Sequence, residues 1–274
     1  MMKLTSGNNG AYGKFRKLFV IGPPRSGTTL LHALCCTSED TNDYVAECSF
    51  FTGLVRNFQE GRRNLKAHNT DFFGSEAAFN AYNANLFKQV LADAWESLGR
   101  PKILALKDPQ MTACMVEMLE LLPEVRFLVS VRNAADTLKS RLKVMQKANL
   151  AITPQFVQTV LNEYLGFYTL AVKVAQLSPK SVTFCCYENL LQQQDKSKLA
   201  KAAGIAAIDE TRLWTPARSN AAHFKNENDP WASEKYGGAI DAGKRNEDVD
   251  ISPYTSVLGQ LEPIYAEAKA KSVI

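Results

Sequence analysis

Four short apolar runs, each followed by polar residues, punctuate the chain at about 17–22, 103–106, 125–131 and 182–187. Short continuous runs that are rich in Val, Ile, Leu and Phe are typical of strands buried on both faces of a parallel sheet. Stretches with apolar residues at helical spacing separate the runs. The pattern therefore predicts an α/β fold, in which helices cover both faces of a parallel β-sheet.

The intervening stretches predict helices of different lengths. Residues 76–98 place apolar side chains on one broad face, and Gly99-Arg100-Pro101 ends that helix. Pro154 begins a long amphipathic helix that Pro179 ends. Further helices are expected at 30–36, at 111–122, from about Asn133 through Arg141 and Met145, and at 256–271. We expect a short strand or extended segment over 42–48, and a helix with an irregular connection over 50–70.

The N-terminus and one late stretch differ in composition from this core. Residues 1–16 are polar and rich in Gly and Asn, so we expect a loose lead-in. A chain of 274 residues can form one large domain or two small ones, and we expect residues 17–274 to form a single domain. Within that domain, residues 215–250 hold few apolar side chains and many Asn, Asp, Lys and Gly, which predicts a long surface loop ahead of the C-terminal helix.

The first apolar run leads directly into a loop with the sequence Gly22-Pro23-Pro24-Arg25-Ser26-Gly27-Thr28-Thr29. A strand, a tight loop and a helix N-terminus form an anion site, because unpaired N–H groups and the positive end of the helix dipole point to one place. Gly27 permits close approach of the backbone, and Arg25 offers a guanidinium group suited to phosphate or sulfate. Hydroxyl donors come from Ser26, Thr28 and Thr29. The alternative is an ordinary strand–turn–helix connection that binds nothing.

The spacing from Gly22 to Gly27 is that of a P-loop, so the expected fold is P-loop-like. Thr28, however, stands where the Walker A lysine would contact the β- and γ-phosphates of a nucleotide. Binding of ATP or GTP is therefore disfavoured.

Polar side chains also follow the other predicted strands. Arg25, Glu47, Lys107, Arg132 and Tyr187 each lie at the carboxyl end of an expected strand or extended segment. Ligands of open α/β sheets bind at these ends, so we expect the five side chains to gather around one site.

Composition restricts the classes of function. The net charge of +4 with scattered Lys and Arg suits an anionic ligand but not a nucleic-acid partner. The six cysteines form no Cys-x-x-Cys pair and the three histidines are far apart, so we expect buried free thiols and no metal site. The N-terminus has no apolar segment of a signal peptide, and no apolar run is long enough to span a membrane. These observations predict a cytoplasmic protein.

Two stretches of the chain resemble sequence motifs of one enzyme family. The stretch Pro24 to Thr29 resembles the 5′-phosphosulfate loop of the sulfotransferases, in the form found in tyrosylprotein and many bacterial members. The stretch from Phe127 to Ser140 resembles the 3′-phosphate motif of that family, except that Ala134 stands where Pro or Gly is usual. In the family an Arg and a Ser hold the 3′-phosphate of 3′-phosphoadenosine 5′-phosphosulfate (PAPS), which implies these roles for Arg132 and Ser140.

Further positions follow from the same resemblance. Lys107 occupies the place of the family's lysine after the middle strand, which implies that it neutralises charge on the bridging oxygen and the sulfuryl group as the S–O bond breaks. From its residue type alone, Lys107 could equally be a surface lysine. Tyr187-Glu188-Asn189-Leu190 resembles the Tyr-Glu-Asp-Leu of the family, which implies Tyr187 near the nucleotide and Glu188 in a structural role. The late loop usually completes the adenine side, but residues 235–238 and 243–245 match too poorly to be assigned.

The general base is expected to be a carboxylate. Cytosolic sulfotransferases use a His two residues after the lysine, where this chain has Pro109. Tyrosylprotein and heparan-type members instead place a catalytic Glu at the end of the strand after the phosphosulfate helix, and Glu47 matches that place. Asp108 is the second candidate, and a carboxylate at a strand end can also be only a salt-bridge partner.

The resemblance covers residues 17–191 and implies the sulfotransferase fold and activity. The expected reaction moves a sulfuryl group from PAPS to an acceptor hydroxyl by in-line displacement and releases adenosine 3′,5′-bisphosphate, without a metal. The acceptor could be a small molecule, a carbohydrate, a lipid or a peptide. Two alternatives remain open: a P-loop kinase-like phosphotransferase with Asp108 as a magnesium ligand, and a nucleotide-binding protein without catalysis.

Overall fold

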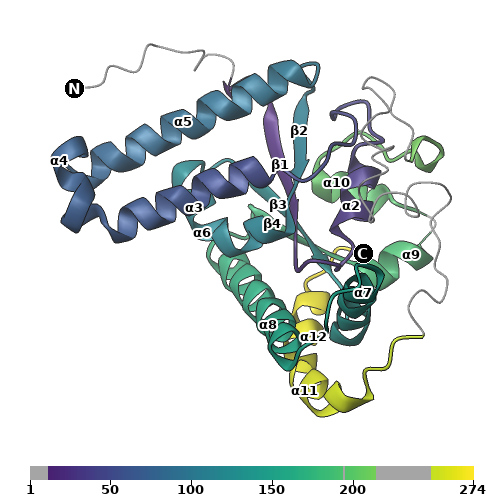
Figure 1. Cartoon of the computed structure of the whole chain (residues 1–274). Helices are drawn as coiled ribbons and strands as arrows, with labels where there is room; N and C mark the ends of the chain where they lie inside the picture. Colours follow the sequence, from purple (N-terminus) through teal and green to yellow (C-terminus); the bar gives the residue numbers. More distant parts are fainter. Residues whose placement is uncertain (1–11, 194, 214–247) are drawn as a thin grey trace.

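A parallel sheet forms the centre of the molecule (Figure 1). The computed structural model describes residues 12–193, 195–213 and 248–274. In these residues the sheet has four strands in the order β2-β1-β3-β4, and all neighbouring pairs are parallel. The strands are β1 (Arg16–Ile21), β2 (Ile103–Lys107), β3 (Arg126–Val131) and β4 (Val182–Cys186). The four apolar runs are therefore the four strands, as the sequence predicts.

Helices connect the strands and cover both faces of the sheet. The first half of the chain contributes α2 (Thr28–Cys35), α3 (Ser49–Arg63), the π-helical turn η1 (Leu65–Asn69), α4 (Thr70–Phe73) and α5 (Glu76–Ser97). Between β2 and β4 lie the 3₁₀ helix η2 (Pro109–Cys114), α6 (Met115–Leu121), α7 (Ala134–Lys147) and α8 (Pro154–Leu177). After β4 come α9 (Tyr187–Gln192), α10 (Ser197–Ala203), η3 (Glu210–Arg212), η5 (Ser252–Tyr254), α11 (Thr255–Gln260) and α12 (Glu262–Ala270).

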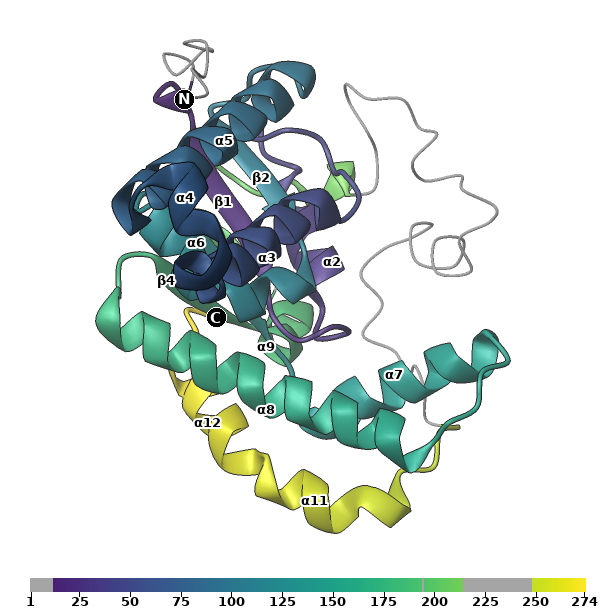
Figure 2. The same ribbon diagram turned by 60° about the vertical axis from the view of Figure 1, so that its left-hand side comes forward.

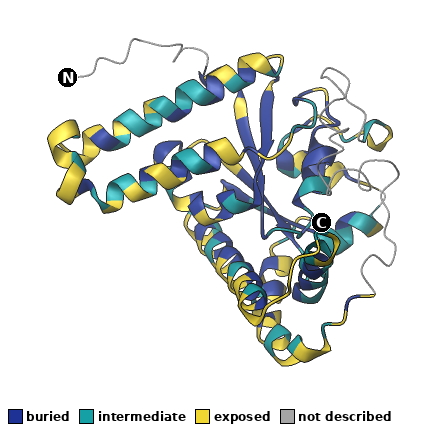
Figure 3. Ribbon diagram, in the orientation of Figure 1, coloured by how far each residue is buried: buried dark blue, intermediate teal, exposed yellow. Residues whose placement is uncertain are grey.

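The strands pack into two separate clusters of buried side chains, one on each face. Along β1, Phe19 and Ile21 belong to the larger cluster, whereas Leu18 and Val20 belong to the smaller one. This alternation follows from the two-residue period of a strand. Helices α3, α5, α6, α7, α8 and α12 contribute to the larger cluster, and α2, α9 and α10 to the smaller one. Figure 3 shows the strands almost wholly buried, with the outer helices exposed along one side.

Helices α3 and α5 run side by side and extend away from the sheet, with α4 at their far end (Figures 1 and 2). Phe58 of α3 stacks on Phe79 of α5 with ring centroids 5.6 Å apart, and both rings are buried. The long helix predicted over 76–98 is therefore one of the two long helices of a helical arm. The predicted irregular connection corresponds to η1 and α4 at the far end of that arm.

Three segments differ from the sequence-based expectation. Residues 12–15 belong to the predicted loose lead-in, but Tyr12 and Phe15 are buried, and Phe15 stacks on Trp95 of α5 at 5.0 Å. The helix predicted over 111–122 starts earlier, at Pro109, as the 3₁₀ helix η2, and Asp108 is its N-cap. The single C-terminal helix is split into α11 and α12 beside Pro263, which has no N–H group to continue the helix.

The expected extended segment runs along the outer edge of β2 and makes no regular strand beyond one bridge at Thr41. Asp40 O accepts a hydrogen bond from Ile103 N at 2.9 Å, and the Asn42 side-chain amide pairs with both backbone groups of Ala105 at 2.7 and 3.0 Å. Farther along, Cys48 N donates to Lys107 O at 2.9 Å. Residues 40–48 are thus held beside β2 over its whole length, which brings Glu47 next to Lys107.

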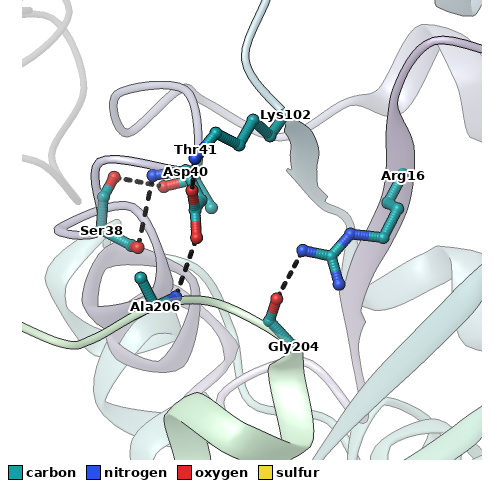
Figure 4. A network of polar contacts seen from close by, with 7 residues as sticks. All are labelled: Arg16, Ser38, Asp40, Thr41, Lys102, Gly204 and Ala206. Atoms are coloured by element: carbon teal, nitrogen blue, oxygen red, sulfur yellow. Dashed lines mark hydrogen bonds and ion pairs between the residues drawn. The ribbon is translucent and has the colours of Figure 1, made fainter.

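A polar network at the start of the strands fixes the segment that follows α10 (Figure 4). The Asp40 carboxylate accepts hydrogen bonds from Lys102 Nζ at 2.7 Å and from Ala206 N at 2.9 Å. Arg16 Nη2 donates to Gly204 O at 2.6 Å. The hydrogen bond from Lys102 is the main cause that lowers the pKa of Asp40, so this carboxylate stays charged in the network.

His32 of α2 gives the fold a specific sensitivity to acid. Its ring is fully buried, and Nε2 lies 3.0 Å from Ala105 O of β2. Burial lowers the pKa of His32 from 6.5 to about 3, so the ring is neutral in the folded protein and becomes charged on unfolding in mild acid. Its contribution to stability is complete above pH 6.5 and is lost as the pH falls toward 3.

We expect the free energy of unfolding of the wild type to fall by up to about 1.4 kcal/mol per pH unit more steeply than that of His32→Asn in this range. Urea unfolding at pH 7, 6, 5 and 4 measures the two slopes, and the comparison cancels the contribution of the carboxylates. Parallel slopes would contradict a neutral buried His32.

Candidate active site

The loop between β1 and α2 adopts, at two positions, a backbone conformation that favours glycine. Gly22 has φ +136° and Gly27 has φ +101°. A Cβ atom at Gly22 would lie 2.7 Å from Ser130 O, and one at Gly27 would lie 2.1 Å from Tyr187 Cδ2. Gly22 N donates to Thr112 Oγ1 at 2.8 Å, which fixes the start of the loop against η2. Gly27 is the N-cap of α2 and has no side chain that could accept a hydrogen bond from the first N–H groups of this helix, which are the groups that bind anions at helix N-termini.

The two predicted phosphate motifs lie against each other. Arg25 Nε donates to Ser140 Oγ at 3.0 Å, and Arg132 Nη1 donates to the carbonyl oxygen of Arg25 at 3.0 Å. The Arg132 guanidinium also lies over the ring of Tyr187, 4.6 Å from its centroid. The side chains of Arg25, Arg132, Ser140 and Tyr187, which come from three separate parts of the chain, therefore converge beside the N-terminus of α2.

One donor at this place lacks a partner. Arg132 Nε is buried and makes no hydrogen bond with any residue that the structure describes. A buried, charged N–H group without an acceptor is costly, and an anionic oxygen would satisfy it. Arg25 adds to this cationic character, and its own backbone adopts the left-handed conformation with φ +74°. The residues present thus fit a phosphate group.

Lys107 lies at the end of β2 and is only 2% exposed. Its Nζ donates to Thr29 Oγ1 of α2 at 3.2 Å and to Glu47 Oε1 at 2.9 Å. The side chain of Glu47 is 54% exposed, so it is accessible from solvent. Lys107 is therefore not a surface lysine. Its ammonium group lies between the first turn of α2 and the exposed carboxylate of Glu47.

Asp108, the second candidate for the base, is occupied in another way. It is 2% exposed, and its Oδ1 accepts a hydrogen bond from Gln110 N at 2.9 Å as the cap of η2. Its Oδ2 accepts a hydrogen bond from the Thr52 hydroxyl of α3. Both carboxylate oxygens thus hold α3 and η2 in place.

The sequence profile of the sulfotransferase family matches residues 17–205, which is more than half of the chain. The chain belongs to the sulfotransferase family. The matched part contains the loop, Glu47, Lys107, Arg132, Ser140 and Tyr187. No curated protein matches the chain significantly.

Solved structures of other sulfotransferases share the fold. The sulfotransferase domain from the curacin biosynthetic pathway superposes with a TM-score of 0.57 at 16% identity, covering 90% of this chain and 98% of that domain. The sulfotransferase domain of the Synechococcus PCC 7002 olefin synthase gives 0.53 at 14% identity, covering 91% and 95%. Sulfotransferase STF9 from Mycobacterium avium gives 0.53 at 13% identity, covering 93% and 76%. At these identities the likeness shows the fold alone, which is the predicted P-loop-like parallel sheet.

The remaining predicted site residues lie in the loop and in the first turn of α2. Ser26 and Thr28 are buried, and the carbonyl oxygen of Ser26 accepts a hydrogen bond from Ser130 Oγ at 2.7 Å. Thr29 is partly exposed at the first turn of α2. The late-loop candidates 235–238 and 243–245 lie outside the described residues.

Sequence reasoning missed several residues that support the candidate site. Thr112 holds Gly22, and Tyr164 and Tyr168 of α8 contact the backbone around Arg132. None of the three belongs to a motif, and the tyrosines have the helical spacing of ordinary core residues. Glu188 accepts hydrogen bonds from Asn133 N at 2.9 Å and Asn133 Nδ2 at 2.8 Å, contacts that suit the structural role implied for it.

Two expectations concern features that were predicted to be absent. The described residues bring together no group of three His, Cys, Asp or Glu side chains that could hold a metal ion. Among the helices that the structure describes, none has the length and apolar character needed to cross a membrane. The six cysteines are all buried and unpaired, as the sequence predicts.

Proposed function

We propose that this sulfotransferase uses PAPS as donor and transfers its sulfuryl group to an acceptor hydroxyl by in-line displacement. The observation that carries the proposal is the position of Lys107. Its buried ammonium group contacts Thr29 at the N-terminus of α2 and Glu47 on the accessible side. A cation between an anion-binding helix end and an exposed carboxylate suits a reaction in which negative charge develops on one side and a proton leaves on the other.

The donor is proposed to bind along the loop and the motif that follows β3. The first N–H groups of α2, with Arg25 and the side chains of Ser26, Thr28 and Thr29, hold the 5′-phosphosulfate. Arg132 and Ser140 hold the 3′-phosphate, an assignment supported by the unpartnered Nε of Arg132. Tyr187, which already stacks on Arg132, lies beside the nucleotide.

The chemistry requires a proton acceptor and cationic groups that offset the developing negative charge. Glu47 removes the proton of the acceptor hydroxyl as that oxygen forms its bond to sulfur. Lys107 and Arg25 offset the charge on the phosphate oxygen as its bond to sulfur breaks, which leaves adenosine 3′,5′-bisphosphate as the second product. Because cationic side chains supply this stabilisation, the proposed mechanism assigns no role to a metal ion.

The kinase-like alternative finds less support. It requires Asp108 as a magnesium ligand, yet both oxygens of that carboxylate accept hydrogen bonds from within the protein. The acceptor is proposed to be a hydroxyl-bearing small molecule, carbohydrate, lipid or peptide that approaches the exposed side of Glu47.

A binding measurement tests the donor. Adenosine 3′,5′-bisphosphate should raise the melting temperature, because it binds only the folded protein, and at 100 times its Kd the stabilisation should be about 2.7 kcal/mol. ADP with magnesium should shift the melting temperature much less, since it lacks the 3′-phosphate that Arg132 and Ser140 are proposed to bind. Calorimetry that gives equal or tighter binding of ADP would overturn the proposal in favour of the kinase.

A further inference from the structure

Two tyrosines of α8 hold the peptide groups on both sides of Arg132. Arg132 N donates to Tyr168 Oη at 3.0 Å, and Tyr168 Oη in turn donates to Ser130 O at 3.0 Å. Tyr164 Oη donates to Arg132 O at 2.7 Å. Both rings are buried, with exposed fractions of 2% and 0%, and they pack edge to face at 4.8 Å.

These contacts occur where the sheet no longer supports the backbone. The pairing of β3 with β1 ends at Val129, and its pairing with β4 ends at Val131. Arg132 is the next residue, and its N–H and C=O groups need partners that the strands do not provide. The two hydroxyl groups take over this task, and Tyr168 uses one donor and one acceptor, which fixes its orientation.

The consequence concerns the direction of the Arg132 side chain. When the peptide groups before and after a residue are both fixed, the direction of its Cα–Cβ bond is fixed as well. From this position the guanidinium reaches the carbonyl oxygen of Arg25 and the face of the Tyr187 ring. Burial raises the pKa of both Tyr164 and Tyr168 far above the usual 10, so both hydroxyl groups keep their protons.

We propose that Tyr164 and Tyr168 are positioning residues that aim Arg132 at the 3′-phosphate of the nucleotide. This inference rests on the proposed function, since it requires a ligand with that phosphate. It assigns to the long helix α8 a part in the selection of the nucleotide, although no residue of α8 needs to touch it.

A double-mutant cycle tests the inference on the full-length protein. The probes are adenosine 3′,5′-bisphosphate and adenosine 5′-phosphate, which lacks the 3′-phosphate, and their affinities are measured by calorimetry. Arg132→Ala should weaken binding of the bisphosphate roughly 30- to 1,000-fold. Tyr168→Phe and Tyr164→Phe should each weaken it roughly 3- to 10-fold, since each loses one hydrogen bond that orients Arg132. Neither Tyr variant should change the affinity for adenosine 5′-phosphate.

In the Arg132→Ala background the Tyr→Phe changes should have no further effect, because the side chain that they position is gone. Val174→Ala is the matched control: it removes buried apolar volume from α8, lowers the melting temperature and should leave both affinities unchanged.

Additive losses in the cycle, or a loss of the same size with adenosine 5′-phosphate, would overturn the positioning role and leave the donor assignment intact. A wild type that binds no bisphosphate would overturn the donor assignment itself.

Discussion

Glu47→Gln should lower turnover by roughly 10²- to 10⁴-fold, which is the usual contribution of a general base. Glutamine keeps the size of the side chain and can still accept the hydrogen bond from Lys107 Nζ, which is 2.9 Å from Glu47 Oε1. It cannot accept the proton of the acceptor hydroxyl. The affinity for adenosine 3′,5′-bisphosphate should change little, because the proposed contacts to its phosphates come from the loop, Arg132 and Ser140 and not from Glu47. Turnover can be followed in the reverse direction with a sulfated phenol and the bisphosphate, if the enzyme accepts this surrogate.

The control for Glu47→Gln is Glu60→Gln, which removes an exposed carboxylate on the outer part of α3 and should leave turnover unchanged. A Glu47→Gln enzyme with near-normal turnover would refute Glu47 as the base. The next variant to measure would then be Asp108→Asn, although the two hydrogen bonds that Asp108 accepts make a loss of stability the expected result there.

Lys107→Met should lower turnover and also weaken binding of the donor. Methionine fills the buried space left by the lysine stem but carries no charge. Turnover should fall by roughly 10²- to 10³-fold, the size of effect seen when one preorganised donor to a developing negative charge is removed. Binding of PAPS should also weaken, because the ammonium group acts in the ground state as well as in the transition state.

Steady-state kinetics and calorimetry separate these two losses. Lys180→Met serves as the control, because Lys180 is an exposed residue in the turn between α8 and β4. If Lys107→Met changed neither turnover nor PAPS binding, the proposal would lose the observation that carries it. Combining Glu47→Gln with Lys107→Met should give less than the sum of the two losses, because the side chains are in direct contact.

The sequence predicts the sheet well because buried parallel strands are read from local composition. Each of the four short apolar runs forms a strand, and the polar residue at or just after its end lies at the carboxyl edge of the sheet. For the same reason the order of runs and polar residues along the chain predicts one shared edge for Arg25, Lys107 and Arg132; in the structure Arg25 contacts Arg132, and Lys107 contacts Thr29 of the same loop and helix. The late loop expected over 215–250 lies outside the described residues except for 248–250, and it remains a prediction.

Other parts of the site depend on contacts between distant segments. Nothing in the sequence of residues 42–48 reveals that the Asn42 amide pairs with Ala105 or that Cys48 N donates to Lys107 O. These contacts hold the segment beside β2 and so bring Glu47 to Lys107. Tyr164 and Tyr168 lie four residues apart on an amphipathic helix, where tyrosines usually only fill the core. Their hydroxyl groups gain a role only because β3 ends beside them in the fold.

The segment over 40–48 also bears on how this sheet avoids self-association. An open edge strand presents unpaired N–H and C=O groups, which can recruit a strand from another molecule and start aggregation. Here Asp40, Asn42 and Cys48 form hydrogen bonds with backbone groups along the outer edge of β2. On the opposite edge, Val273 N donates to Phe184 O of β4 at 3.0 Å, so the C-terminal residues cover that side. The segment that carries the proposed base thus also protects the edge of β2 from pairing with a strand of another molecule. A substitution that detaches this segment from β2 would expose an aggregation-prone edge and would also displace Glu47.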